Sequence, residues 1–280
     1  MTAATMTLAA SVRTDARLTF PRIVRSEWIK LTSLRSTVWS LGLIAVLGIG
    51  MSLAMASLGG WEASTPDPNL VLTITTVGVA FGQLIAAVLG VLVVSGEYST
   101  GMIRSTLAAV PTRLPVLAAK TLVLFVLVTV VGAVTVFGAW AATYPLLATN
   151  NMAVGLGELE FTVALLGTAA YLGLTAVFAL GVGTLLRSAA GGIAAALGVI
   201  LVIPMIMPLL AMAFDWVTDL APYMFSSAGA AMSSIAADSQ AAANPLQPEQ
   251  LEPWLGGVVV LIWTAVSLAV GAITLRRRDA

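Results

Sequence analysis

The stretch that decides the fold runs from Thr121 to Leu147, reads TLVLFVLVTVVGAVTVFGAWAATYPLL and contains no charged side chain. A bilayer hydrocarbon core about 30 Å thick takes roughly 20 helical residues to cross, and this stretch is longer than that. A helix of a soluble protein would show a polar face at a period of about 3.6 residues, whereas this stretch is apolar on every side. It therefore predicts a membrane-spanning helix.

Five further charge-free runs of comparable length lie elsewhere in the 280-residue chain. Only 9% of the residues are charged, against about 25% in an average soluble domain. We therefore predict an all-α membrane protein with six transmembrane helices, near residues 38–58, 71–95, 115–147, 159–186, 191–213 and 254–275. A flexible cytoplasmic N-terminus (1–19) and an interfacial helix (20–36) are expected before this single transmembrane domain (37–280).

The basic residues orient the chain. With six spans, all 13 lysines and arginines fall on one side, and nine of the 13 acidic residues fall on the other. The net charge of zero therefore hides a surplus of nine positive charges on one side and nine negative charges on the other. Because basic loops stay in the cytoplasm, we predict a multi-pass protein of the cell membrane with both termini cytoplasmic.

The composition excludes several chemistries. The chain has no Cys and no His, so thiol nucleophiles, disulfides, Cys/His zinc sites and a Ser-His-Asp triad are impossible. We expect no catalytic residue and no metal site, and the balanced charge gives no indication of a nucleic-acid partner. No Asp, Glu, Lys or Arg lies near the middle of a predicted span, which argues against an ion-coupled transporter.

The interfacial helix carries one unexpected residue. An apolar face is formed by Phe20, Ile23, Val24, Trp28, Leu31 and Leu34, as in a helix that lies flat on a membrane. Glu27 falls in the middle of this face. Because an unpaired buried carboxylate is costly, we expect Glu27 to meet Arg35, Arg104 or Lys120; a plain membrane anchor is the alternative reading of the helix.

The cytoplasmic segment 96–113 is the most distinctive loop. Gly96 and Gly101 have the glycine spacing of a Walker A loop, but Met102 and Ile103 stand where that motif needs Lys and Ser or Thr. The chain therefore cannot bind ATP by that motif. A short helix from Gly101, ended by Pro111, is predicted to be a docking surface for a cytoplasmic partner, with a simple reversal loop as the alternative.

Three features are predicted on the other side and within the spans. Extracellular segment 214–253 is too polar for a comfortable span and predicts helices that re-enter the outer leaflet, which is tolerated where protein covers them. Pro204 and Pro208 should bend the fifth span. The glycines of the second, fourth and fifth spans indicate close helix packing; they include Gly78, Gly82, Gly167, Gly173, Gly181, Gly183, Gly191, Gly192 and Gly198.

Two motifs resemble the integral-membrane permease of an ATP-binding-cassette exporter of the type-2 permease class. One is RSEWIKL (25–31) with SLRST (33–37) before the first span, and the other is GEYSTGMIR (96–104) followed by Pro111, Arg113 and Lys120. The resemblance implies six spans, cytoplasmic termini, an amphipathic elbow helix and a re-entrant helical hairpin before the last span. In that class the elbow residues would be Glu27, Trp28, Lys30 and Arg35, and the residues coupled to the ATPase would be Glu97, Tyr98, Ser99, Thr100, Gly101, Met102, Ile103 and Arg104.

The resemblance also implies a function. The chain would be the permease subunit of an ATP-driven exporter of an apolar or amphipathic substrate, such as a drug, antibiotic, peptide or lipid, by alternating access. Two copies of a separate ATPase subunit would bind ATP and Mg, a second permease copy or a paralogue would complete the dimer, and this chain would bind no cofactor itself. The substrate-binding residues are unknown. An ion-coupled secondary transporter and a non-transporting membrane scaffold or assembly protein are the alternatives.

Overall fold

The computed structural model describes residues 19–59, 66–99, 101–102, 114–235 and 251–277, and these residues form helices and no strands. Six helical segments are long and apolar enough to cross a bilayer: α2 (Arg35–Leu58), α4 (Val79–Ser99), α6 (Leu114–Ala148), α7 (Leu159–Leu186), the segment Ala189–Ala211 and α12 (Pro253–Arg277). The prediction of an all-α, multi-pass membrane protein is confirmed at this level. The shorter helices are α1 (Phe20–Ser33), α3 (Pro68–Thr76), α8 (Ala189–Leu197), α9 (Ile203–Ala211), α10 (Asp215–Leu220) and α11 (Phe225–Met232).

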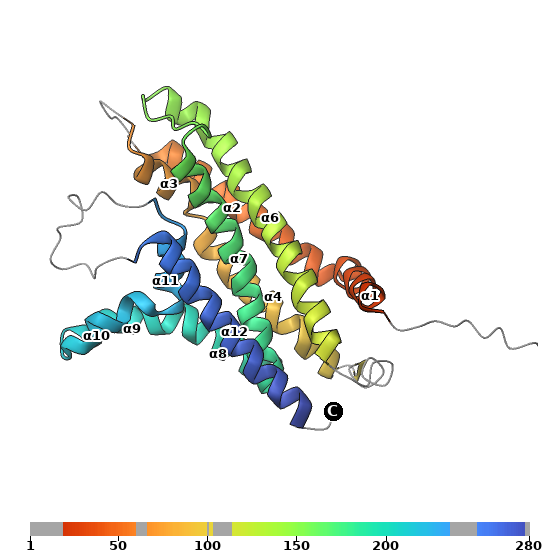
Figure 1. Cartoon of the computed structure of the whole chain (residues 1–280). Coiled ribbons are helices and arrows are strands. Elements are labelled where there is room, and N and C mark those ends of the chain that lie inside the picture. Colours follow the sequence, from red (N-terminus) through yellow and green to blue (C-terminus); the bar gives the residue numbers. More distant parts are fainter. Residues whose placement is uncertain (1–18, 60–65, 100, 103–113, 236–250, 278–280) are drawn as a thin grey trace, which may run out of the picture.

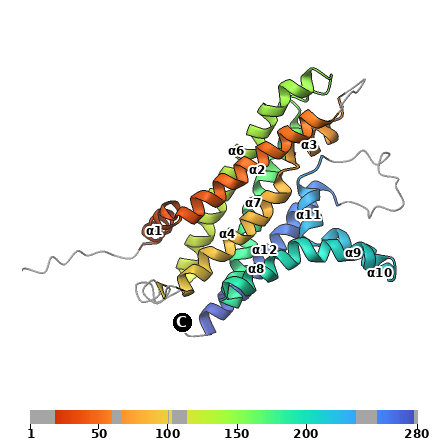
Figure 2. The same cartoon turned by 180° about the vertical axis from the view of Figure 1, so that it is seen from behind.

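Helix α7 forms the centre of the bundle, with α4, α6 and α12 packed around it (Figures 1 and 2). Small residues bring the backbones together. Gly90 of α4 lies directly against the carbonyl oxygen of Ala176 in α7, and a Cβ on Gly271 of α12 would lie 2.9 Å from the carbonyl oxygen of Gly181. The close packing predicted at Gly181 is confirmed, whereas Gly198 has no described atom within 4 Å of where a Cβ would lie.

The bundle has two chemically different ends. Helix α1, the start of α6 and the ends of α4, α7 and α12 lie together at one end (Figures 1 and 2); we call it the basic end because Lys30, Lys120, Arg187 and Arg276 lie there. The start of α7, preceded by Glu158, lies at the opposite end, the acidic end. The basic residues from four separate segments are thus on one side, as predicted from the charge pattern.

The second span differs from its predicted course. Residues 71–95 were expected to form one helix, but α3 ends at Thr76 and α4 starts at Val79. In a continuous helix, the carbonyl of Thr75 would accept from the amide of Val79; here the hydroxyl of Ser52 in α2 donates to that carbonyl at 2.7 Å. Gly78 lies in the break, where a Cβ would be 2.5 Å from the Cα of Gly48. The helix is therefore interrupted at Val77 and Gly78, where it approaches α2 most closely.

The fifth span contains an irregular turn just before Pro204, one of the two prolines expected to bend it. Between α8 and α9 lies a π-helical turn, η1 (Gly198–Val202). Because Pro204 has no N–H, it cannot donate to the carbonyl of Ile200 four residues earlier, and the hydroxyl of Ser226 donates to that oxygen instead at 2.6 Å. Beyond η1 the chain leaves the bundle (Figures 1 and 2), and α9 has no buried residue.

Helix α11 returns from α10, through the 3₁₀ turn η2 (Ala221–Tyr223), to the bundle. Phe225, at its start, is fully buried, and its ring stacks on Phe178 of α7 with centroids 4.6 Å apart. The carbonyl of Tyr223 accepts from the indole N–H of Trp263 in α12 at 3.0 Å. The segment before the last span is therefore fixed against the middle of α7 and α12.

Candidate functional site

Four charged side chains form a closed ring at the basic end. The Nζ of Lys30 lies 2.8 Å from Glu27 Oε1 and 3.2 Å from Glu97 Oε1. The Nζ of Lys120 lies 2.7 Å from Glu27 Oε2 and 2.9 Å from Glu97 Oε1. Positive and negative groups alternate around the ring, and their charges cancel. We call these four residues the ion ring.

The ring joins three helices that are far apart in sequence. Glu27 and Lys30 come from α1, Glu97 from the last turn of α4 and Lys120 from the second turn of α6. Three of the four side chains are buried; Lys30 is about one-third exposed. A buried charge is tolerated only when it is paired and hydrogen-bonded, so each of these helix ends depends on the others for its position.

The sequence of α1 explains why Glu27 points inward. Ile23, Glu27 and Leu31 are four residues apart and are the three buried residues of this helix. Residues at this spacing lie on one face of a helix. Ile23 packs with Val116 of α6 in a small cluster, and Leu31 belongs to the main core. The apolar neighbours therefore hold Glu27 against the start of α6.

The ring favours the charged forms of Glu27 and Lys30. Burial raises the pKa of the Glu27 carboxyl, but the adjacent Lys120 charge and the hydrogen bonds from Lys120 and Lys30 outweigh burial and hold the pKa below its ordinary value of 4.5. Burial lowers the pKa of Lys30, but the hydrogen bond to Glu27 and the charge of Glu97 raise it above 10.5. Glu27 thus stabilises the fold above about pH 4.5, and this stabilisation is lost as the pH falls through the lowered pKa of Glu27. Lys30 stabilises the fold below about pH 10.5, and this stabilisation is lost as the pH rises through the raised pKa of Lys30.

The expected partner of Glu27 is confirmed for one of three candidates. Glu27 binds Lys120, whereas Arg35 is exposed at the start of α2 and is not part of the ring. Arg104 lies outside the described residues. Lys30, which the sequence analysis named only as an elbow residue, is the second partner of Glu27, three residues further along the same helix.

The predicted coupling residues divide into two groups. Glu97, Tyr98 and Ser99 form the last turn of α4, and Glu97 is only 7% exposed. Gly101 follows with a positive φ of 70°, which favours glycine, and is exposed together with Met102. Thr100, Ile103, Arg104 and the helix expected up to Pro111 lie outside the described residues. Glu97 is buried in the ion ring, so any part it takes in coupling would pass through the ring.

Arg187 is a second contact point at the basic end that sequence reasoning missed. It ends α7 in the left-handed conformation, with φ at 52°. Its Nη2 donates to the carbonyl of Thr274 in α12 at 3.3 Å, and its guanidinium lies 5.3 Å from the ring centroid of Tyr98 in α4. A lone arginine between two long apolar runs was the available signal.

In the part of the chain that the structure describes, no group of three or more Asp or Glu side chains lies close enough together to hold a metal ion.

No protein-family model matches the chain, and no curated protein matches it. The site is therefore defined by its geometry: a neutral ring of paired charges that fixes α1, α4 and α6 to each other.

Proposed function

We propose that the chain is the transmembrane permease subunit of an ATP-driven exporter, powered by a separate ATP-binding-cassette ATPase. The observation that best supports this proposal is the position of the ion ring in the chain. Glu97 stands just before residues 100–113 and Lys120 just after them, and both bind Glu27 or Lys30 of α1. The sequence resemblance assigns residues 97–104, within the cytoplasmic segment 96–113, to ATPase docking. A force applied to this segment would act on α4 and α6 together, and through the ring on α1.

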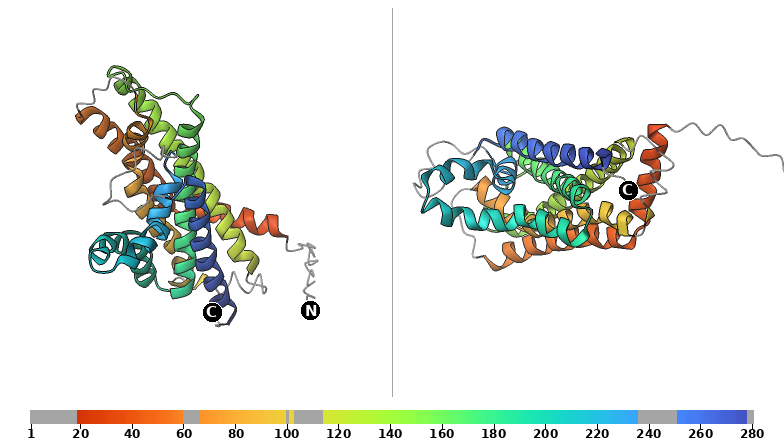
Figure 3. Two further views of the ribbon diagram at one scale, coloured as in Figure 1. Left: turned by 60° about the vertical axis from the view of Figure 1, so that its left-hand side comes forward. Right: turned by 90° about the horizontal axis from the view of Figure 1, so that it is seen from below.

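The basic end faces the cytoplasm in this proposal. Helix α1 crosses the end of the bundle instead of running along it (Figures 1 and 3). Phe20 and Trp28 are exposed on α1, and Leu34 is exposed directly after it, whereas Ile23 and Leu31 pack inward. This arrangement supports an elbow helix that lies in the interface, with apolar side chains toward lipid and toward the bundle. Residues 223–232, packed against the middle of α7 and α12, would be the covered re-entrant part of the extracellular segment.

Export is by alternating access in a dimer of permeases over two ATPase subunits. This chain makes no chemical bond, because ATP and Mg are bound by the partner. The substrate is apolar or amphipathic, since the spans offer leucine, valine, alanine, methionine and phenylalanine surfaces without charge. Arg187 supports the transmission of movement, because its contacts with Tyr98 and Thr274 connect the ends of α4, α7 and α12.

The test begins with purification of the chain from cells that express it and identification of an ATP-binding-cassette ATPase in the complex. ATP hydrolysis and transport are then measured in vesicles. We expect Arg104→Glu to lower ATP-driven transport more than tenfold while the protein stays in the membrane. Arg277→Glu makes the same charge change at the same end, outside the docking segment, and should retain transport.

Three outcomes would contradict the proposal. Unchanged transport in Arg104→Glu would refute the docking assignment. Transport without any ATPase would indicate a secondary carrier. A purified protein that neither binds an ATPase nor transports would indicate a scaffold.

A further inference from the structure

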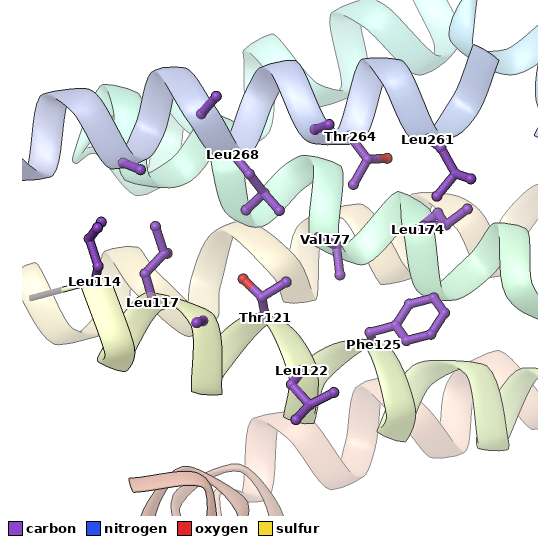
Figure 4. Close-up of a pocket in the computed structure, with 14 residues that line it drawn as sticks. Leu114, Leu117, Thr121, Leu122, Phe125, Leu174, Val177, Leu261, Thr264 and Leu268 are labelled. Carbon is purple, nitrogen blue, oxygen red and sulfur yellow. The ribbon is translucent and has the colours of Figure 1, made fainter. Parts of the chain in front are cut away.

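An open apolar groove of about 720 Å³ lies between α6 and α12 in the half of the bundle nearest the basic end (Figure 4). Leu117 and Phe125 of α6 line one side, Leu261 and Leu268 of α12 line the other, and Val177 of α7 forms part of the floor. The groove exists because both helices pack against α7 and because alanines, including Ala118, Ala265, Ala269 and Ala272, stand where larger side chains would meet. Among the lining residues, only two threonines are polar.

One arginine stands at the basic mouth of this groove. Ala265, Ala269 and Ala272 line the groove at a spacing of three to four residues along α12, and Arg276 is the next position on the same face. Side chains of a helix tilt toward its N-terminus, which in α12 is the direction of the groove. Arg276 is exposed, and no described ion pair involves it.

The length of the groove fits one leaflet of a bilayer. From Leu261 to Ala272 the lining covers about 16 Å of helix at 1.5 Å per residue. Half of a hydrocarbon core is about 15 Å thick. An uncharged groove of this length, with a guanidinium at the end that would lie at the membrane surface, has the chemistry of an acyl chain joined to an anionic headgroup.

We propose that the groove holds an acyl chain of an anionic phospholipid from the surrounding bilayer, with the lipid phosphate bound by Arg276. The guanidinium offers several N–H donors in a fork that matches phosphate oxygens. The open groove, lined mostly by leucine and alanine, suits a flexible chain. This inference rests on membrane insertion and on Arg276, and it is independent of whether the chain is an exporter.

The absence of cysteine makes a direct test possible. Ala269→Cys in the groove and Val266→Cys outside it, on the exposed face of the same helix, are each labelled with bimane. Both proteins are reconstituted in vesicles of phosphatidylcholine, and brominated phosphatidylglycerol or brominated phosphatidylcholine is then titrated as a quencher. At Ala269→Cys we expect phosphatidylglycerol to quench at about fivefold lower mole fraction, the effect of one basic residue near the surface.

Arg276→Gln should abolish that preference at Ala269→Cys, and Arg277→Gln, which points to another face of α12, should retain it. At Val266→Cys the preference should be smaller and insensitive to Arg276→Gln. The proposal is overturned if both lipids quench Ala269→Cys equally, or if Arg276→Gln changes nothing. Protection of Ala269→Cys from both quenchers would also overturn it, because protein would then cover the groove.

Discussion

At the residue scale, the most informative side chain is Glu27. It lies between Ile23 and Leu31 on the buried face of α1 and is 1% exposed. Each of its two carboxylate oxygens accepts a hydrogen bond from a lysine ammonium. Removing one member of a buried pair leaves the other charge without compensation. Removing one charge of the ring is therefore expected to lower the stability of the protein more than removing one positive and one negative charge together.

We expect Glu27→Gln to destabilise the protein by about 3 kcal/mol, because the buried ammonium of Lys120 would lose the charge of one of its two carboxylate partners. The measurement is the midpoint of thermal unfolding in detergent, followed by tryptophan fluorescence. The double variant Glu27→Gln with Lys120→Met restores a neutral cluster and should recover part of the loss.

The control for this cycle is Glu160→Gln, which removes an exposed carboxylate from the first turn of α7. It should leave the midpoint unchanged, since exposed charges contribute little. If Glu27→Gln unfolds at the same temperature as the wild type, the ring does not hold α1 against the bundle.

At the element scale, helix packing depends on positions where no side chain is present. In α4, Gly90 lies against the backbone of Ala176 in α7, and a Cβ there would also lie 3.1 Å from Ala179 Cβ. Gly96 is on the same helix, yet a Cβ added to it would meet no described atom within 4 Å. The two glycines therefore differ in packing and share the low helix propensity of glycine.

Replacing each of them by alanine separates these two effects. Gly90→Ala should destabilise the protein by about 1–3 kcal/mol, because the added methyl group forces α4 and α7 apart. Gly96→Ala should be neutral or stabilising by up to about 1 kcal/mol, since alanine favours the helix. Thermal unfolding of both variants in the same detergent gives the comparison, and equal midpoints would mean that α4 and α7 do not touch at Gly90.

At the scale of the whole molecule, the separation of charge decides the orientation. Basic residues from α1, α6, α7 and α12 gather at one end of the bundle, and Glu158 and Glu160 lie at the start of α7, at the other. Positively charged loops stay on the cytoplasmic side. The basic end is therefore expected inside the cell, and residues 150–158 outside.

Single cysteines introduced into the cysteine-free chain test this orientation. Gly157→Cys, at the acidic end, should react with a membrane-impermeant maleimide in intact cells. Ala189→Cys, exposed at the start of α8 at the basic end, should react only after the cells are permeabilised. The reverse pattern would show the opposite orientation, and labelling of both in intact cells would contradict a sealed six-span topology.

Parts of the site were predictable from local pattern alone. Glu27 was expected to meet a lysine or arginine because a carboxylate interrupts an apolar helical face, and Lys120 was among the three candidates. The role of Glu97 was not predictable in the same way. Its partners Lys30 and Lys120 are 67 and 23 residues away, and nothing in its neighbours distinguishes a buried ring member from an exposed loop residue.

The sequence by itself determined the number of long apolar helices, since a hydrocarbon core excludes charge and the charge-free runs have the length needed to cross it. It also predicted that basic residues from separate segments gather together, and Lys30, Lys120 and Arg187 do lie at one end of the bundle. Only the tertiary structure decided where helices are interrupted and which ends are joined. At the break between α3 and α4, the hydroxyl of Ser52 donates to the carbonyl of Thr75. At η1, the hydroxyl of Ser226 donates to the carbonyl of Ile200, to which Pro204 cannot donate. These contacts join residues 22 or more positions apart, so no local pattern of charge or hydrophobicity encodes them.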